Sequence, residues 1–165
     1  MKWLLSSIAL LTLVTTNTFA EDAGRAKSID FAAKVSMANM FEIEAAKVEL
    51  AKGKADDARQ FARDMLKDHE KAALLLIEAA KEDGIPFPTS LDAEHQQKVK
   101  ALQDSDPANL DQAYLSTQLT VHQDALTLFE SFSKSGPDGQ LRNVAGKIVP
   151  DLHMHLTRVE GLTSK

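Results

Sequence analysis

Four residues whose side chains can bind a metal ion are spread along the chain, one in each of its four longest helical segments. They are Glu42, His69, His122 and His155. Imidazole nitrogen and carboxylate oxygen are ligands for transition metals, so the set predicts a site for zinc, copper(II) or iron(II) rather than copper(I). The chain contains no cysteine, which excludes disulfides, thiolate chemistry and cysteine-ligated zinc or iron–sulfur sites.

All four candidate ligands fall on the apolar face of their segment when the sequence is rotated by about 100° per residue. Most polar residues instead fall on the opposite, solvated faces. Three further polar residues, Asp68, Gln118 and Tyr114, share the apolar faces with the ligands. We therefore expect these three side chains to support the ligands by hydrogen bonding.

The predicted turn between the first two segments brings two of the ligands to similar heights. Glu42 lies eleven residues before Gly53, and His69 lies fourteen residues after Ala55. If the segments are antiparallel helices, the offset is roughly 5 Å at a rise of 1.5 Å per residue. Long side chains can bridge that distance.

Two other interpretations of the polar residues remain open. A buried Glu–His hydrogen-bond network could hold the helices in register without any metal. A di-metal oxidoreductase is the third interpretation, but such bundles use the motif Glu-x-x-His twice. No glutamate in this chain is followed by a histidine three residues later, which counts against ferroxidase or oxygen-activating chemistry.

The segments that position these residues all have helical periodicity. Five are predicted: 28–52, 55–83, 91–102, 107–134 and 140–161. Ser28, Ser90 and Asp106 are the predicted N-caps, and Gly53 ends the first segment. Pro150 predicts a kink in the last segment rather than two helices. Four long segments and one short one predict an all-α fold, an antiparallel four-helix bundle with a short crossover helix.

Residues 1–20 have the layout of a secretory signal peptide, with Lys2 before an apolar run and Thr18-Phe19-Ala20 at the cleavage site. The run is shorter than the roughly 20 residues that span a membrane. The predicted mature domain, 21–165, is then periplasmic or otherwise exported, free or peripherally associated with the envelope. The net charge of −5 becomes −6 on losing Lys2, which argues against nucleic acid and anionic membranes as main partners. No protein partner is indicated.

Four stretches resemble a known family of bacterial ferritin-like domains. They are Phe41–Ala46, Phe61–Met65 leading to Asp68-His69, Tyr114-Leu115 leading to His122, and Val149–Leu152 leading to His155. The family is the domain of unknown function 4142, whose members are often labelled outer-membrane proteins. The resemblance covers nearly all of the predicted mature chain. It implies a ferritin-like bundle exported in Gram-negative bacteria, without an established activity.

The resemblance also implies a set of characteristic polar positions, Glu42, Asp68, His69, His122 and His155, which the helical faces indicate independently. We therefore expect a non-catalytic exported bundle with a metal or small-ligand site, because the di-metal motif is missing. A structural or stress-associated interaction protein without metal is the alternative.

The export prediction can be checked by mass. Expression of the full chain should give a product cleaved after Ala20, because small residues occupy the cleavage-determining positions. Intact-mass spectrometry of the periplasmic fraction measures this. Retention of residues 1–20, with the protein in the inner membrane, would show that the segment is an anchor.

Overall fold

Five helices and no strand make up residues 14–164, the part of the chain that the computed structural model describes. The helices are α1 (Val14–Lys52), α2 (Asp56–Glu82), α3 (Ala93–Asp104), α4 (Leu110–Ser135) and α5 (Gln140–Thr163). The predicted all-α fold is confirmed. None of the described helices is both long and apolar enough to cross a membrane.

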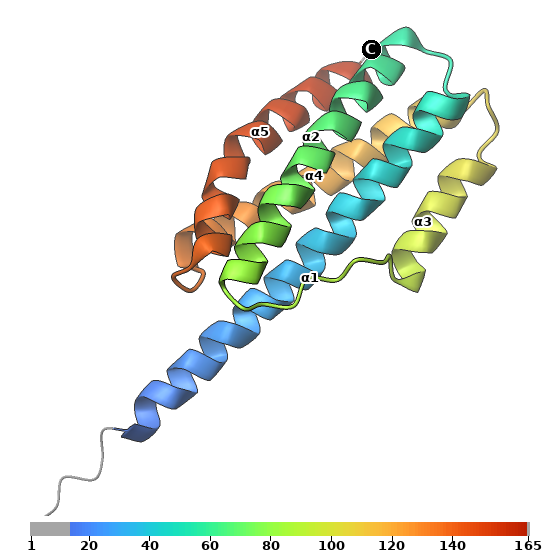
Figure 1. Ribbon diagram of the computed structural model, residues 1–165. Coiled ribbons are helices and arrows are strands. Elements are labelled where there is room, and N and C mark those ends of the chain that lie inside the picture. The colour runs from blue at the N-terminus through green and yellow to red at the C-terminus, as the bar shows by residue number, and fades with distance from the viewer. Residues whose placement is uncertain (1–13, 165) are drawn as a thin grey trace, which may run out of the picture.

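The four long helices form a bundle in which neighbours run in opposite directions (Figure 1). Helix α1 packs against α2 and α4, and α5 packs against the same two helices from the opposite corner. Helices α2 and α4 run in parallel, so the chain needs a crossover between them. The short helix α3 provides that crossover and lies outside the bundle against α1 (Figure 1).

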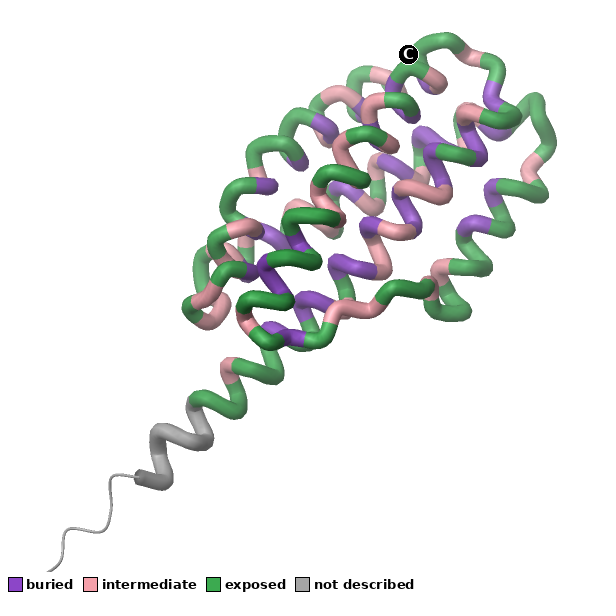
Figure 2. Tube along the Cα trace, viewed as in Figure 1, coloured by how far each residue is buried: buried purple, intermediate pink, exposed green. Residues whose placement is uncertain are grey.

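The first helix begins earlier than predicted. It starts at Val14 rather than Ser28, so Ser28 is not an N-cap but a buried residue inside α1. The reason is that residues 21–27 contain good helix formers and no proline, so nothing ends the helix there. Residues 21–27 of α1 extend beyond the bundle and are exposed at nearly every position (Figure 2). Residues 1–13 of the predicted leader lie outside the described residues.

Two other helix starts differ from the prediction. Helix α3 is capped by Asp92, whose carboxylate accepts a hydrogen bond from the backbone N–H of His95, rather than by Ser90. Helix α4 starts at Leu110, because Asp106 accepts from the Ala108 N–H and closes a turn over 107–109. The remaining helix ends agree with the prediction to within two residues, and α5 continues as one helix through Pro150.

The interior has two apolar clusters, one toward each end of the bundle. One contains Phe41, Phe61 and Tyr114, and the other contains Phe31 and Phe129. On every long helix the chain passes from one cluster to the other, and the purple, buried positions continue along the inner faces (Figure 2). His69, His122 and His155 lie on the stretches of chain between the two clusters, and Glu42 directly follows Phe41 of the first cluster.

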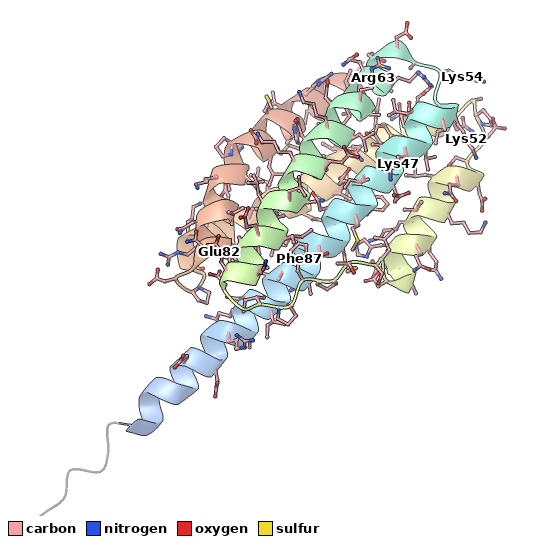
Figure 3. The ribbon with its side chains drawn as sticks, viewed as in Figure 1. Lys47, Lys52, Lys54, Arg63, Glu82 and Phe87 are labelled. Carbon is pink, nitrogen blue, oxygen red and sulfur yellow. The ribbon has the colours of Figure 1, made fainter. Side chains whose placement is uncertain are left out.

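Aspartates distant in sequence hold both ends of the bundle. At one end, Asp111 of α4 accepts hydrogen bonds from the backbone N–H groups of Lys54 and Ala55, in the turn between α1 and α2. Lys52 ends α1 directly before this turn and Lys54 lies within it (Figure 3), and the Lys52 ammonium donates to the Gln103 carbonyl of α3. These bonds fix the heights of α1, α2, α3 and α4 relative to one another.

At the other end, Asp83 follows α2 and caps the N-terminus of α5. Its two carboxylate oxygens accept from the backbone N–H groups of Gln140 and Leu141, each at 2.8 Å. A helix N-terminus leaves such N–H groups without partners inside the helix, so a carboxylate from elsewhere stabilises it.

Replacing Asp83 should therefore destabilise the bundle. We expect Asp83→Ala to lower the free energy of unfolding by about 1–2 kcal/mol, the typical cost of losing a helix cap. Urea unfolding followed by circular dichroism measures it. Asp124→Ala, at an exposed position within α4, is the matched control and should change stability by less than about 0.5 kcal/mol. Equal losses in the two variants would contradict the capping role.

Candidate metal centre

Three histidines from three helices meet inside the bundle. His69 comes from α2, His122 from α4 and His155 from α5. Their ring centroids lie 5.4 to 5.9 Å apart in all three pairings. Each histidine offers one ligand atom that lies within 4.8 Å of the ligand atoms of the other two. Among residues 14–164, these three side chains form a group of potential metal ligands close enough to share one ion. Three of the four predicted ligands therefore converge.

The His69 ring is held by Asn39 of α1. The Asn39 amide nitrogen donates to the backbone carbonyl of His69 at 3.0 Å, which fixes the orientation of the amide group. Its amide oxygen therefore faces the Nδ1 atom of the His69 ring, also at 3.0 Å. Since an amide oxygen only accepts, Nδ1 must carry the proton, and Nε2 is left with its lone pair.

The other two rings are fixed in the same way. His122 Nδ1 donates to the backbone carbonyl of Gln118 at 2.9 Å, and His155 Nε2 donates to the Asp68 carboxylate at 3.1 Å. Carbonyl and carboxylate oxygens accept, so these nitrogens carry the protons. Two of the predicted supporting residues, Asp68 and Gln118, thus contact the histidines directly.

One nitrogen of each ring has no protein partner. These atoms are His69 Nε2, His122 Nε2 and His155 Nδ1, and all three are inaccessible to solvent. His69 as a residue keeps partial exposure, but its Nε2 atom does not. A buried nitrogen with a free lone pair is costly to leave unpaired. The three rings therefore present three oriented acceptors that a metal ion, or hydrogen-bond donors, can satisfy.

Two of the rings, His69 and His122, are held in their neutral form. Burial and the nearby His155 lower the pKa of His122 to about 4, against the opposing effect of the Gln118 carbonyl. Burial, together with His122 and His155, holds the pKa of His69 well below 6.5. Neutral imidazole is the form that binds metal ions.

Glu42 lies beside the cluster rather than within the group of three. Its Oε1 is 3.7 Å from His122 Nδ1, the nitrogen that already donates to Gln118, and its Oε2 accepts from the Gln118 side chain at 2.5 Å. Burial raises the pKa of Glu42 to about 8, although the Gln118 hydrogen bond lowers it. At neutral pH the carboxyl group is therefore mainly protonated.

Tyr114, the third predicted supporting residue, does not reach the histidines. It lies one turn before Gln118, packed against the Phe61 ring, and its hydroxyl has no partner among the described protein groups. Burial raises the pKa of Tyr114 well above its usual value, and the carboxyl groups of Glu42 and Glu49 act in the same direction. Tyr114 therefore remains a neutral phenol in the apolar cluster next to the site.

The other two histidines of the chain lie elsewhere. His95 pairs with Asp92 at the start of α3, and its ring contacts Phe41. His153 projects from the exposed side of α5 and pairs with Glu130 of α4. His153 and His155 point to different sides of one helix, so they cannot share an ion while α5 stays helical.

Asn39 and Glu49 of α1 are buried polar residues near the site that helical periodicity did not indicate. Asn39 lies fourteen residues before Gly53, level with His69, which lies fourteen after Ala55. This level pairing was the signal that could have identified it. Glu49 is fully buried with both carboxylate oxygens unpaired, and burial together with the nearby Asp111 raises its pKa to about 8.

The buried histidines should make the metal-free protein sensitive to acid. The pKa of His122 is lower in the folded state than in the unfolded chain, so its stabilising effect is present above about pH 6.5 and is lost as the pH falls toward 4. We expect the wild type to lose roughly 2 kcal/mol more than His122→Gln between pH 7 and pH 5. Urea unfolding in the presence of a chelator measures this difference.

The comparison with His122→Gln is needed because Glu42 acts in the opposite direction. Its raised pKa gives stability that is full below about pH 4.5 and is lost as the pH rises through 8. Glu42 is present in both proteins, so its effect largely cancels in the difference. Identical pH profiles for the two proteins would mean that His122 is not buried in its neutral form.

Two solved structures resemble this fold. A fragment of a DUF305 protein from Deinococcus radiodurans aligns with a TM-score of 0.71 and 15% sequence identity, over 84% of this chain and 95% of the other. A DUF305 protein from Streptomyces coelicolor, described as a candidate secreted protein, aligns with a TM-score of 0.68 and 13% identity, over 82% and 89%. At such identities the likeness concerns the fold, a ferritin-like helical bundle.

No curated protein matches the chain. The family model described as "Domain of unknown function (DUF4142)" matches residues 14–162, which include all five helices almost completely and every residue of the histidine cluster. The chain belongs to the DUF4142 family.

Proposed function

We propose that this protein is an exported helical bundle that binds one divalent transition-metal ion through His69, His122 and His155. One observation carries the proposal: each ring has one nitrogen fixed by a protein acceptor and the other buried without a partner. Metal-binding histidines have this arrangement, in which the second nitrogen donates to a carbonyl or carboxylate and thereby orients the ring.

The spacing of the rings suits a single ion after a small contraction. Around tetrahedral zinc, with Zn–N bonds of about 2.0–2.1 Å, the nitrogens lie roughly 3.4 Å apart. The ligand atoms are within 4.8 Å of one another. The rings therefore need to move toward each other by no more than about 1.5 Å on binding.

The donor set favours zinc, copper(II) and iron(II). Three imidazoles provide no sulfur for copper(I), and no group of carboxylates for magnesium or calcium. Glu42 is the fourth residue of the predicted set, and it reaches the ion only after its side chain rotates away from Gln118. In the present arrangement its carboxyl group accepts a hydrogen bond from the Gln118 side chain and lies 3.7 Å from His122 Nδ1.

A polar groove leads toward the cluster from the surface. It has a volume of about 180 Å³, lies between α2 and α5, and is bordered by His69, His155, Asp68 and Asp151. Its border also includes Lys71 and Lys147, which balance the charges of the two aspartates. The groove supports the proposal because it gives an ion a short route to the histidines.

Export of the protein is proposed from the leader. Residues 1–20 have the order of charge, apolar run and small residues that signal peptides share. The description of the Streptomyces coelicolor protein as a candidate secreted protein agrees with this assignment.

A structural role without metal is the second candidate. Each histidine already has one hydrogen bond to the protein, and a buried water could donate to the unpaired nitrogens. The cluster would then align the four long helices as a polar layer. The two candidates differ in one measurable respect, since only the first predicts that divalent metal stabilises the folded state.

Metal should raise the melting temperature of the wild type. An ion that binds only the folded state contributes about 2.7 kcal/mol at a hundredfold excess over Kd. That corresponds to an increase of roughly 5 °C or more for a domain of this size. Thermal unfolding followed by circular dichroism, with zinc, copper(II) or iron(II) added to chelator-treated protein, measures it.

The controls separate the buried cluster from surface histidines. His122→Gln removes one ligand from the cluster and should abolish the increase. His153→Gln, on the exposed side of α5, is the matched control and should leave it unchanged. The metal proposal is wrong if zinc, copper(II) and iron(II) all fail to raise the melting temperature of the wild type. It is also wrong if His122→Gln shows the same increase as the wild type. The structural role as a polar layer then remains.

A further inference from the structure

A small cavity lies next to the histidine cluster inside the bundle. Its volume is about 40 Å³, and His69, His122, Asn39 and Glu42 form its polar end. His69 and His122 are two of the residues whose Nε2 atoms have no protein partner. The cavity therefore adjoins the place where a bound ion would have unused coordination positions.

The size and walls of the cavity limit what it can hold. About 40 Å³ is room for roughly three water-sized spheres. The remaining lining residues are all apolar: Val35, Ala38, Ala72, Leu76, Val121, Ala125, Phe129, Ile148 and Leu152. Moving a charged group into such surroundings is costly, so an uncharged molecule of two or three atoms fits best.

A larger groove lies on the outside of the same wall. It has a volume of about 410 Å³ and is formed where α3 lies beside the seam between α1 and α4. Five side chains border both the groove and the cavity: Val35, Ala38, Val121, Ala125 and Phe129. Three of these, Ala38, Val121 and Ala125, are partly exposed to solvent. At these three positions only one layer of small side chains separates the cavity from the groove.

We propose that this cavity binds an uncharged diatomic molecule, such as nitric oxide or dioxygen, at an open coordination position of the ion, and that Ala38, Val121 and Ala125 form its entrance. The proposal rests on the proposed metal site, because three protein ligands leave at least one position of the ion to an outside ligand. The ion and the diatomic molecule then arrive by different routes, the ion through the polar groove between α2 and α5.

Nitric oxide is the probe, added without oxygen to protein loaded with iron(II). The binding step forms an iron–nitrogen bond, releases a bound water and needs no other reactant. Electron paramagnetic resonance detects the ferrous nitrosyl complex, and stopped-flow absorbance gives its rate of formation. We expect one nitrosyl complex per iron in the wild type, and at least tenfold slower binding of azide, because an anion must cross the apolar layer at the entrance.

Ala125→Leu tests the entrance, because the added atoms occupy the layer shared by groove and cavity. It should slow nitrosyl formation at least tenfold while iron(II) affinity stays within twofold of wild type. Ala113→Leu, at a partly exposed alanine of α4 three turns away, is the matched control and should keep the wild-type rate. If Ala125→Leu does not fold, Ala38→Val makes a smaller change in the same layer and should slow the reaction at least threefold.

Each other result has a distinct meaning. If the wild type binds no iron(II), the metal proposal fails for iron and this inference fails with it. If iron binds but no nitrosyl forms, the metal proposal stands and the diatomic pocket is overturned. Equal rates in wild type and the folded entrance variant overturn the assigned entrance, and azide binding as fast as nitric oxide overturns the uncharged ligand class.

Discussion

Each imidazole buried in this bundle has two ring nitrogens, and the protein provides a partner for only one of them. The partners are an amide from α1, a backbone carbonyl of α4 and a carboxylate from α2. They determine which nitrogen carries the proton and so where the lone pair lies. Because the three lone pairs are buried, they determine what this part of the interior can hold. The two apolar clusters on either side isolate the polar layer from bulk water.

The topology brings this layer together. Antiparallel neighbours connected by short turns place residues equally far from the turn at the same height, as Asn39 and His69 demonstrate. The bonds of Asp111 and Asp83 to backbone groups keep those heights fixed at both ends. The crossover through α3 makes α2 and α4 parallel, and it leaves α3 beside the α1–α4 seam rather than inside the bundle. The outer groove is a consequence of that crossover.

Helical periodicity was sufficient to predict the bundle and to place three histidines on inner faces, because burial follows the 3.6-residue repeat over long segments. Helical periodicity could not distinguish Glu42 from the three converging ligands, because the direction of a side chain on a helix face depends on its rotamer. Glu42 points toward the donor nitrogen of His122. Asn39 and Glu49 were missed for another reason. In the sequence both look like ordinary polar residues of α1. They are buried because α2 and α4 pack against them, and the sequence of α1 alone does not indicate those contacts. The start of α1 was missed because Ser28 is a good cap in isolation, but the residues before it also favour helix.

The charges around the cluster favour one ion over two. Bundles that hold two metal ions surround them with four or more carboxylates, whose negative charge offsets that of the ions. Among residues 14–164, the group that converges here consists of three imidazoles and no carboxylate. The nearest carboxyl groups are Glu42, which burial keeps largely protonated, and Asp68, which faces the far side of His155. A second divalent ion would meet the charge of the first with little compensation. The absence of Glu-x-x-His in the sequence and the lack of converging carboxylates therefore both favour the proposed single ion over a pair of ions.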